Sequence, residues 1–197
     1  MKIRSAGLSG ALSILAVVAL LAVTGHAAWR IKQSAALARL SDAWQASPEA
    51  PQLSLLIVGD STAVGTGAST PANSVAGLMA RDHPRLRIVN RARDGARFAD
   101  IALQLEGDER FDAILVMGGG NDVIRLTGHE ALEHDIADAA HLARTRARLV
   151  LIMPPGNVGN APFFFPPLSW LMTQRAKALH RFVREAAADN GAVYVNL

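Results

Sequence analysis

The sequence predicts an α/β fold in which one parallel five-stranded sheet follows an N-terminal hydrophobic helix. Two observations carry this prediction. Short apolar runs alternate with helix-like segments, and a long uncharged stretch precedes the first run. A strand and a helix repeating at about thirty residues are typical of βαβ units, whose crossovers build one parallel sheet with helices on both faces. The chain has 197 residues, enough for one such domain with a sizeable core.

The N-terminal stretch from Ser5 to Trp29 carries no formal charge, and residues 11–23 are almost wholly apolar. Because a helix of about 20 apolar residues spans a bilayer, we expect residues 1–30 to form a signal anchor or transmembrane helix. The domain would then lie outside the cytoplasm, on the periplasmic side if the protein is bacterial. The alternative is a signal peptide cleaved near Gly25-His26-Ala27 and a secreted protein. Basic residues flank the stretch on both sides, so its orientation stays open.

Residues 31–52 are expected to form a helical stalk that ends in the linker Ser47–Pro51, and residues 53–197 the folded domain. The expected strands are Leu53–Val58, Leu86–Val89, Ala113–Met117, Leu149–Met153 and Ala192–Val195. The expected helices are Ser74–Arg81, Phe98–Leu105, Gly128–Arg144 and Leu168–Asn190. The first run is apolar throughout and stops at small residues, which is typical of a central parallel strand. Thr127 and Glu130 have the spacing of a capping box for the third helix.

Composition excludes several kinds of site. The chain has no cysteine, so it has no disulfide, thiol nucleophile or cysteine zinc site. The net charge is only +3, and we expect no nucleic-acid partner. Arginines gather between Arg81 and Arg97, diluted by three aspartates. We interpret them as a solvated face, the alternative being attraction of an anionic substrate or acidic lipid headgroups.

Four loops follow strands and should meet at one edge of the sheet, since parallel strands share their carboxyl ends there. They are residues 59–62, 90–95, 118–122 and 154–157. Ser61 in the first loop is a nucleophile if a base takes its proton, or the N-cap of a following helix. Gly95 can aim a backbone N–H at a developing negative oxygen, and Asn121 adds an amide donor.

Three blocks in this order resemble the SGNH or GDSL hydrolases: Ile57–Ser61, Asn90–Gly95 and Gly119–Asp122. The resemblance covers about residues 53–197. It implies a three-layer, flavodoxin-like, doubly wound fold. It also implies an enzyme that hydrolyses esters without a metal or other cofactor. The substrates would be lipid, thioester, acetylated-glycan or other small-molecule esters. By position, the resemblance makes Ser61 the nucleophile. The oxyanion hole would be the N–H groups of Ser61 and Gly95 with the Asn121 side chain.

One block of that family is missing from its expected place. Its general base is the histidine of an Asp-x-x-His that follows the last strand, and no such block occurs before Leu197. We therefore expect the domain to be cut short at its C-terminal end. Asp138 and His141 match the string, but inside a helix that runs away from the site. Only His129, at the first turn of its helix, starts at the correct edge, and the general base stays unknown.

Two hypotheses follow. The first is a membrane-anchored serine esterase, and the second is a catalytically incomplete SGNH-fold binding or scaffold domain at the membrane. Nucleotide binding is disfavoured, because the glycines after Val58 have neither P-loop nor Gly-x-Gly-x-x-Gly spacing. The apolar segment 162–170 would form an acyl-pocket wall, a surface that dips into lipid, or internal packing. The oligomeric state stays open.

Overall fold

The computed structural model describes residues 41–196 and six residues of the N-terminal stretch: Ile14, Val17, Val18, Leu21, Gly25 and Trp29. Two compact units make up the chain, Met1–Arg39 and Leu40–Leu197. The expected membrane helix or signal peptide, and the first half of the expected stalk, lie mostly outside the described residues. Among those that are described, no helix is both long and apolar enough to cross a membrane.

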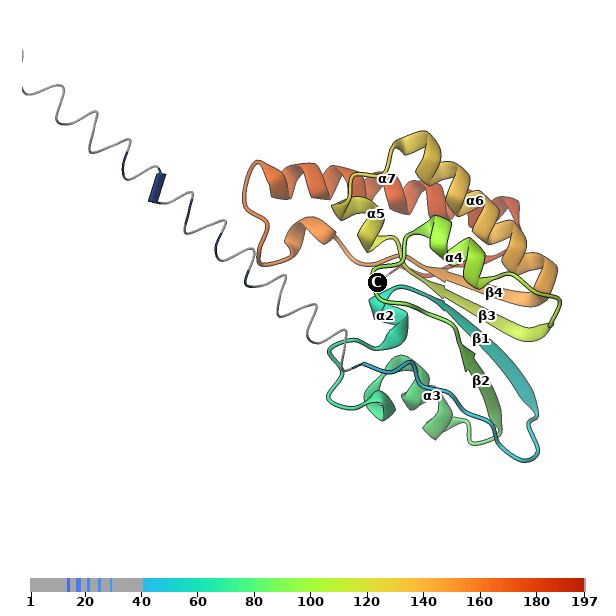
Figure 1. Ribbon diagram of the computed structural model, residues 1–197. Helices are drawn as coiled ribbons and strands as arrows, with labels where there is room; N and C mark the ends of the chain where they lie inside the picture. Colours follow the sequence, from blue (N-terminus) through green and yellow to red (C-terminus); the bar gives the residue numbers. More distant parts are fainter. Residues whose placement is uncertain are drawn as a thin grey trace, which may run out of the picture. The chain divides into compact units, whose positions relative to one another are not determined.

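Five parallel strands form one sheet in the order β2-β1-β3-β4-β5 (Figure 1). Their bounds are β1 Leu53–Gly59, β2 Leu86–Asn90, β3 Phe111–Met117, β4 Ala147–Met153 and β5 Val193–Tyr194. This order is that of flavodoxin-like doubly wound sheets, which bind ligands where the strand order reverses, beside β1 and β3. The predicted parallel five-stranded sheet is confirmed, with a shorter last strand.

Helices lie on both faces of the sheet (Figure 1). The helices are α2 Ser61–Val64, α3 Val75–Asp82, α4 Phe98–Gln104, α5 Gly120–Ile124, α6 His129–Arg146 and α7 Leu168–Asp189, with 3-10 turns η1 Pro71–Asn73 and η2 Val158–Asn160. Helices α4, α6 and α7 pack on one face, and α2 and α3 on the other. The four long helices agree with the prediction to within two residues at each end.

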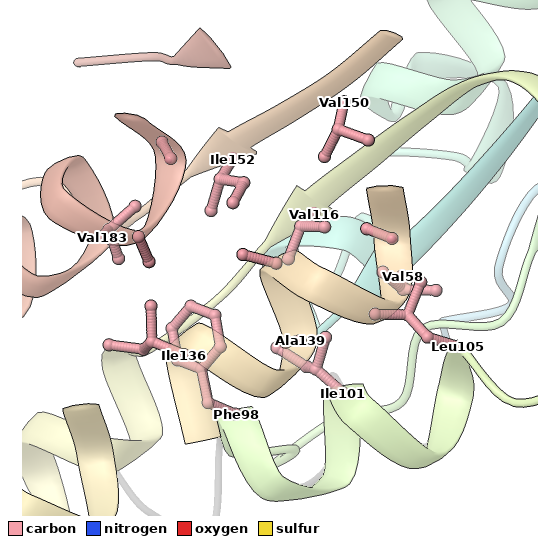
Figure 2. Close-up of a cluster of buried hydrophobic side chains, with 14 of the residues drawn as sticks. Val58, Phe98, Ile101, Leu105, Val116, Ile136, Ala139, Val150, Ile152 and Val183 are labelled. Atoms are coloured by element: carbon pink, nitrogen blue, oxygen red, sulfur yellow. The ribbon is translucent and has the colours of Figure 1, made fainter. Parts of the chain in front are cut away.

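Apolar side chains fill both sides of the central strands. On one face Val58 and Val116 pack under Phe98 and Ile136, as Figure 2 shows. On the other face Ile57 and its neighbours pack against α2 and α3. Strands buried on both faces need continuous apolar runs, which is why β1 reads as one in the sequence.

The outer half of the sheet is covered less completely than we expected from a three-layer fold. In the described part of the chain, Leu149 of β4 and Val193 of β5 each keep 48% of their surface exposed. Both side chains lie on the face that carries α3, because Leu149 shares a side with Leu151, the register partner of Val193. On that face α2 and α3 therefore cover mainly β1, β2 and β3.

Residues 41–52 do not form the expected helical stalk. The side chain of Gln45 accepts a hydrogen bond from the Asn90 backbone N–H at 2.9 Å and donates to the Asn90 carbonyl at 2.6 Å. Ala46 forms an antiparallel bridge with Ile88. The segment thus runs along the outer edge of β2, where it satisfies backbone groups that an edge strand would leave open.

Helix α6 does not begin with the predicted capping box. Its N-cap is Gly128, which makes no side-chain cap bond. The Thr127 hydroxyl donates instead to the Asp122 carboxylate at 3.0 Å. The Thr127 hydroxyl therefore bonds a buried carboxylate on α5 and does not cap α6.

Candidate active site

Ser61 lies at the carboxyl end of β1 as the first residue of α2. The N-cap is Asp60, whose side chain accepts from the Thr62 N–H at 2.9 Å, so the alternative of Ser61 as N-cap is wrong. Ser61 is half-buried. Its hydroxyl has no hydrogen-bond partner among the described residues, which leaves it available for another role.

The turn before Ser61 requires a glycine. Gly59 has φ +150°, and a Cβ there would collide with the carbonyl oxygen of Met117 on β3. The buried side chain of Gln104 on α4 holds both backbone groups of Gly59: it accepts from the N–H at 2.7 Å and donates to the carbonyl at 3.0 Å. Ser61 therefore follows a strand end that is fixed by two neighbouring elements.

The loop after β2 is tied to the same strand end. The Arg93 N–H donates to the Gly59 carbonyl at 3.0 Å, and Asn90 donates its side-chain amide to the Ala63 carbonyl of α2 at 2.9 Å. The Thr66 hydroxyl donates to the Asp94 carboxylate at 2.6 Å. These bonds bring the loop that carries Gly95, at φ +78°, against the segment that carries Ser61.

Asn121 on α5 joins the same group. Its side-chain amide donates to the carbonyl of Ala96, next to Gly95, at 3.0 Å. An asparagine amide nitrogen carries two protons, and this bond uses one of them. Helices α2 and α5 lie at the same edge of the sheet (Figure 1). Ser61, Gly95 and Asn121 are therefore connected through short backbone and side-chain bonds, and their assigned roles stay predictions.

Two buried carboxyl groups lie under these loops. Burial raises the pKa of Asp60, against the opposing effect of the Thr62 N–H. Burial also raises the pKa of Asp122, which accepts from the Phe98 N–H and the Thr127 hydroxyl, both at 3.0 Å. Both carboxyls hold backbone or hydroxyl groups of neighbouring segments in place. No grouping of three His, Asp or Glu side chains that could hold a metal occurs in the described residues.

None of the histidines within residues 41–196 bonds to Ser61. His129 is exposed, and its ring packs edge-on against Phe182 of α7 with ring centres 5.9 Å apart. His141 is exposed on α6. The general base therefore stays unassigned, and His129 stays a prediction.

His180 on α7 reaches further than its position inside a helix indicated. Its Nε2 lies 2.8 Å from the Pro155 carbonyl, in the loop after β4, and its Nδ1 lies 2.7 Å from the Tyr194 hydroxyl. Since both ring nitrogens have partners, His180 links α7 to β5 and to the loop after β4. Nothing in the sequence signals this contact, because each partner is remote along the chain.

A model of the GDSL-like Lipase/Acylhydrolase family matches residues 57–197. The chain belongs to this family. The GDSL-like chain is also 32% identical over 150 residues to a GDSL-like esterase of Mycobacterium tuberculosis, across 71% of this chain and 45% of that protein. It thus spans about half the length of this curated relative.

Solved structures share the GDSL-like fold. TesA has a TM-score of 0.57 and 24% identity, with 72% of this chain and 76% of TesA covered. An acetylxylan esterase from Geobacillus stearothermophilus has a TM-score of 0.55 and 21% identity, with 76% and 78% covered. The family predicted from the three sequence blocks is confirmed.

Proposed function

We propose that this GDSL-type chain is a serine esterase that hydrolyses carboxylic esters through Ser61. The observation that carries the proposal is the bonded connection between three loops: Arg93 to Gly59, and Asn121 to Ala96. Among the described residues, these bonds connect the segment of Ser61, whose hydroxyl has no partner there, with a positive-φ glycine and with a side-chain amide that uses one of its two protons.

The chemistry assigned to these groups is acyl transfer. The Ser61 oxygen attacks the ester carbonyl carbon while its proton passes to a base, and the carbonyl oxygen becomes negative. The N–H groups of Ser61 and Gly95 and the second amide proton of Asn121 would stabilise that oxygen. The C–O bond to the alcohol then breaks, the alcohol takes the proton, and water releases the acyl group from Ser61.

The base is the part of the mechanism that the described residues leave open. We propose a histidine of an Asp-x-x-His block that follows residue 197 in a longer chain. The Mycobacterium tuberculosis relative is consistent with a longer chain, because this chain covers only 45% of its length. His129 is the weaker candidate, being engaged with Phe182.

Ser61→Ala tests the proposal in a chain that includes any downstream Asp-x-x-His. We expect p-nitrophenyl acetate hydrolysis to be lost, whereas Ser69→Ala, an exposed serine bonded to Asn73, keeps it. Unchanged hydrolysis in Ser61→Ala would contradict the proposal.

The second candidate function is a binding or scaffold domain without turnover, favoured by the absence of any partner for the Ser61 hydroxyl within the described residues. A fluorophosphonate probe separates the two. Covalent labelling of Ser61 requires an activated hydroxyl and contradicts the scaffold function, whereas an unlabelled Ser61 in the longer chain supports it.

For the substrate we propose a lipid, acetylated glycan or other small ester, at a membrane outside the cytoplasm. The name of the Geobacillus relative supports acetyl esters. Lipid is supported by exposed apolar side chains in the segment after β4, with Phe165 58% and Trp170 66% exposed. Cell fractionation with the mass of the mature N-terminus distinguishes a retained anchor from a cleaved signal.

A further inference from the structure

A cavity of about 750 Å³ lies against the loop that carries Gly95. Its wall consists of residues 90–96, three residues of α4, and Arg125 just beyond α5. Gly95 and Ala96 therefore belong both to this cavity and to the proposed oxyanion loop. A group bound in the cavity would lie against the same loop as the proposed oxyanion donor of Gly95.

Two arginines of the wall are exposed to solvent, Arg93 and Arg125. Within the part of the chain that the structure describes, their guanidinium groups make no hydrogen bond or ion pair. Arg125 lies close to the loop, since a Cβ on Gly95 would be 3.2 Å from its Nη2. The third arginine, Arg91, already donates to the carbonyls of Gln104 and Glu106.

The two carboxylates of the wall are engaged by the protein itself. Asp94 accepts from the Thr66 hydroxyl at 2.6 Å, and Asp100 accepts from the Arg97 N–H at 2.9 Å. These bonds occupy one acceptor site on each carboxylate. The wall nevertheless carries more positive than negative side chains, three arginines against two aspartates, and each guanidinium offers five donors. Beside them, Leu103 is 63% exposed and gives the cavity an apolar side.

We propose that this cavity binds an anionic group, a carboxylate or a phosphate, on the acyl or alcohol part of the ester, with Arg125 and Arg93 as its ligands. Planar guanidinium groups bind such anions through paired N–H donors. Leu103 contacts the short aliphatic segment that joins the anion to the ester. This inference rests on the proposed esterase function, because it assumes that the ligand carries an ester. Binding of the anion itself does not require turnover.

Calorimetric binding to full-length Ser61→Ala tests the site without hydrolysis. The probes are monomethyl succinate, neutral dimethyl succinate and inorganic phosphate. We expect monomethyl succinate to bind roughly tenfold or more tightly than dimethyl succinate, and Arg125→Gln to weaken its binding about tenfold. Arg85→Gln is the matched control, an exposed arginine at the opposite end of β2, and it leaves binding unchanged.

The outcomes are separable. If phosphate binds more tightly than monomethyl succinate, the result supports a phosphate-bearing substrate. If monomethyl succinate binds more tightly, it supports a carboxylate-bearing one. Equal affinity for charged and neutral succinate esters, equal losses in Arg125→Gln and Arg85→Gln, or no binding of either anion would overturn the proposal. The binding measurement does not depend on turnover. If the longer wild-type chain with any downstream Asp-x-x-His hydrolyses no ester, the proposed function is contradicted but the anion site is not.

Discussion

Asn121 donates its side-chain amide to the carbonyl of Ala96 at 3.0 Å, so the residue proposed to bind an oxyanion also holds the loop of its neighbouring donor. An asparagine that makes one bond at rest and offers a second proton to the substrate needs no rearrangement when negative charge develops. Donors fixed in advance in this way are worth more than mobile ones, because the reaction does not have to reorient them.

Asn121→Ala is therefore expected to lower kcat for p-nitrophenyl acetate by about a hundredfold to a thousandfold, the usual effect of deleting one oxyanion donor. The measurement is steady-state kinetics in the longer chain. The urea midpoint shows whether the loss comes from the loop instead. Asn157→Ala is a control on the fourth rim loop, where the side chain accepts from the Gly159 N–H. A similar kcat in Asn121→Ala and wild type would remove Asn121 from the site.

Gly59→Ala should destabilise the fold by about 3 kcal/mol, since the new Cβ meets the Met117 carbonyl and the backbone has φ +150°. Urea unfolding followed by circular dichroism measures this. Gly128→Ala is the matched control, because Gly128 has φ −55° and open space around it. Equal stability of the two variants would show that the end of β1 is not constrained by β3.

Gln104→Leu should cost roughly 2 kcal/mol of unfolding free energy, because it leaves the buried N–H of Gly59 without a partner and removes one of the two donors to the Gly59 carbonyl, the other being the Arg93 N–H. We also expect a lower kcat with little change in KM, since the end of β1 positions Ser61. Gln174→Leu, at an exposed position of α7, serves as the control for adding the same side chain. A full kcat in Gln104→Leu would contradict the positioning role.

Asp60 gives stability a defined pH dependence. Burial raises its pKa above the ordinary 3.8, so the native state holds this proton more tightly than the unfolded chain does. The resulting stabilisation is complete below the unfolded pKa and is lost as the pH rises through the folded pKa. Asp60→Asn keeps a cap acceptor and removes the titration. The variant should therefore gain in unfolding free energy relative to wild type as the pH rises above 3.8.

The control for this prediction has the opposite sign. Hydrogen bonds from Ser54 lower the pKa of Asp112, so its contribution is present above the unfolded pKa and is lost as the pH falls through the folded pKa. Asp112→Asn should therefore lose stability relative to wild type as the pH rises. Parallel trends in Asp60→Asn and Asp112→Asn would contradict both assignments.

The sheet and its rim were predictable because buried parallel strands leave long apolar runs such as Leu53–Val58, and because loops that follow such strands share one edge. The short helices α2 and α5 were not predicted. Four or five residues are too few for a helical period, and these turns depend on the Asp60 cap and on Gly119 at φ +109°.

Other details depend on partners remote in the sequence. The composition of residues 41–46 suits a helix, but the Gln45 side chain hydrogen-bonds the backbone of Asn90 instead. Thr127 has capping-box spacing, but Asp122 takes its hydroxyl. His180 was placed inside a helix, and only the packing of α7 brings it to Pro155. The local sequence pattern does not show whether a side chain will bond a neighbour along the chain or a residue that only the fold brings close.

Helices cover one part of the sheet more completely than the other, so we expect the two parts to open locally at different free energies. Strands β1, β2 and β3 pair along most of their length, whereas β5 pairs with β4 only at Leu151 and Ile152. Segments with few buried contacts exchange their amide hydrogens through small local openings, and central strands only through global unfolding. Ser61 and Asn121 follow the central strands β1 and β3. We therefore expect the proposed chemistry to depend on the part of the sheet that exchanges its amide hydrogens most slowly.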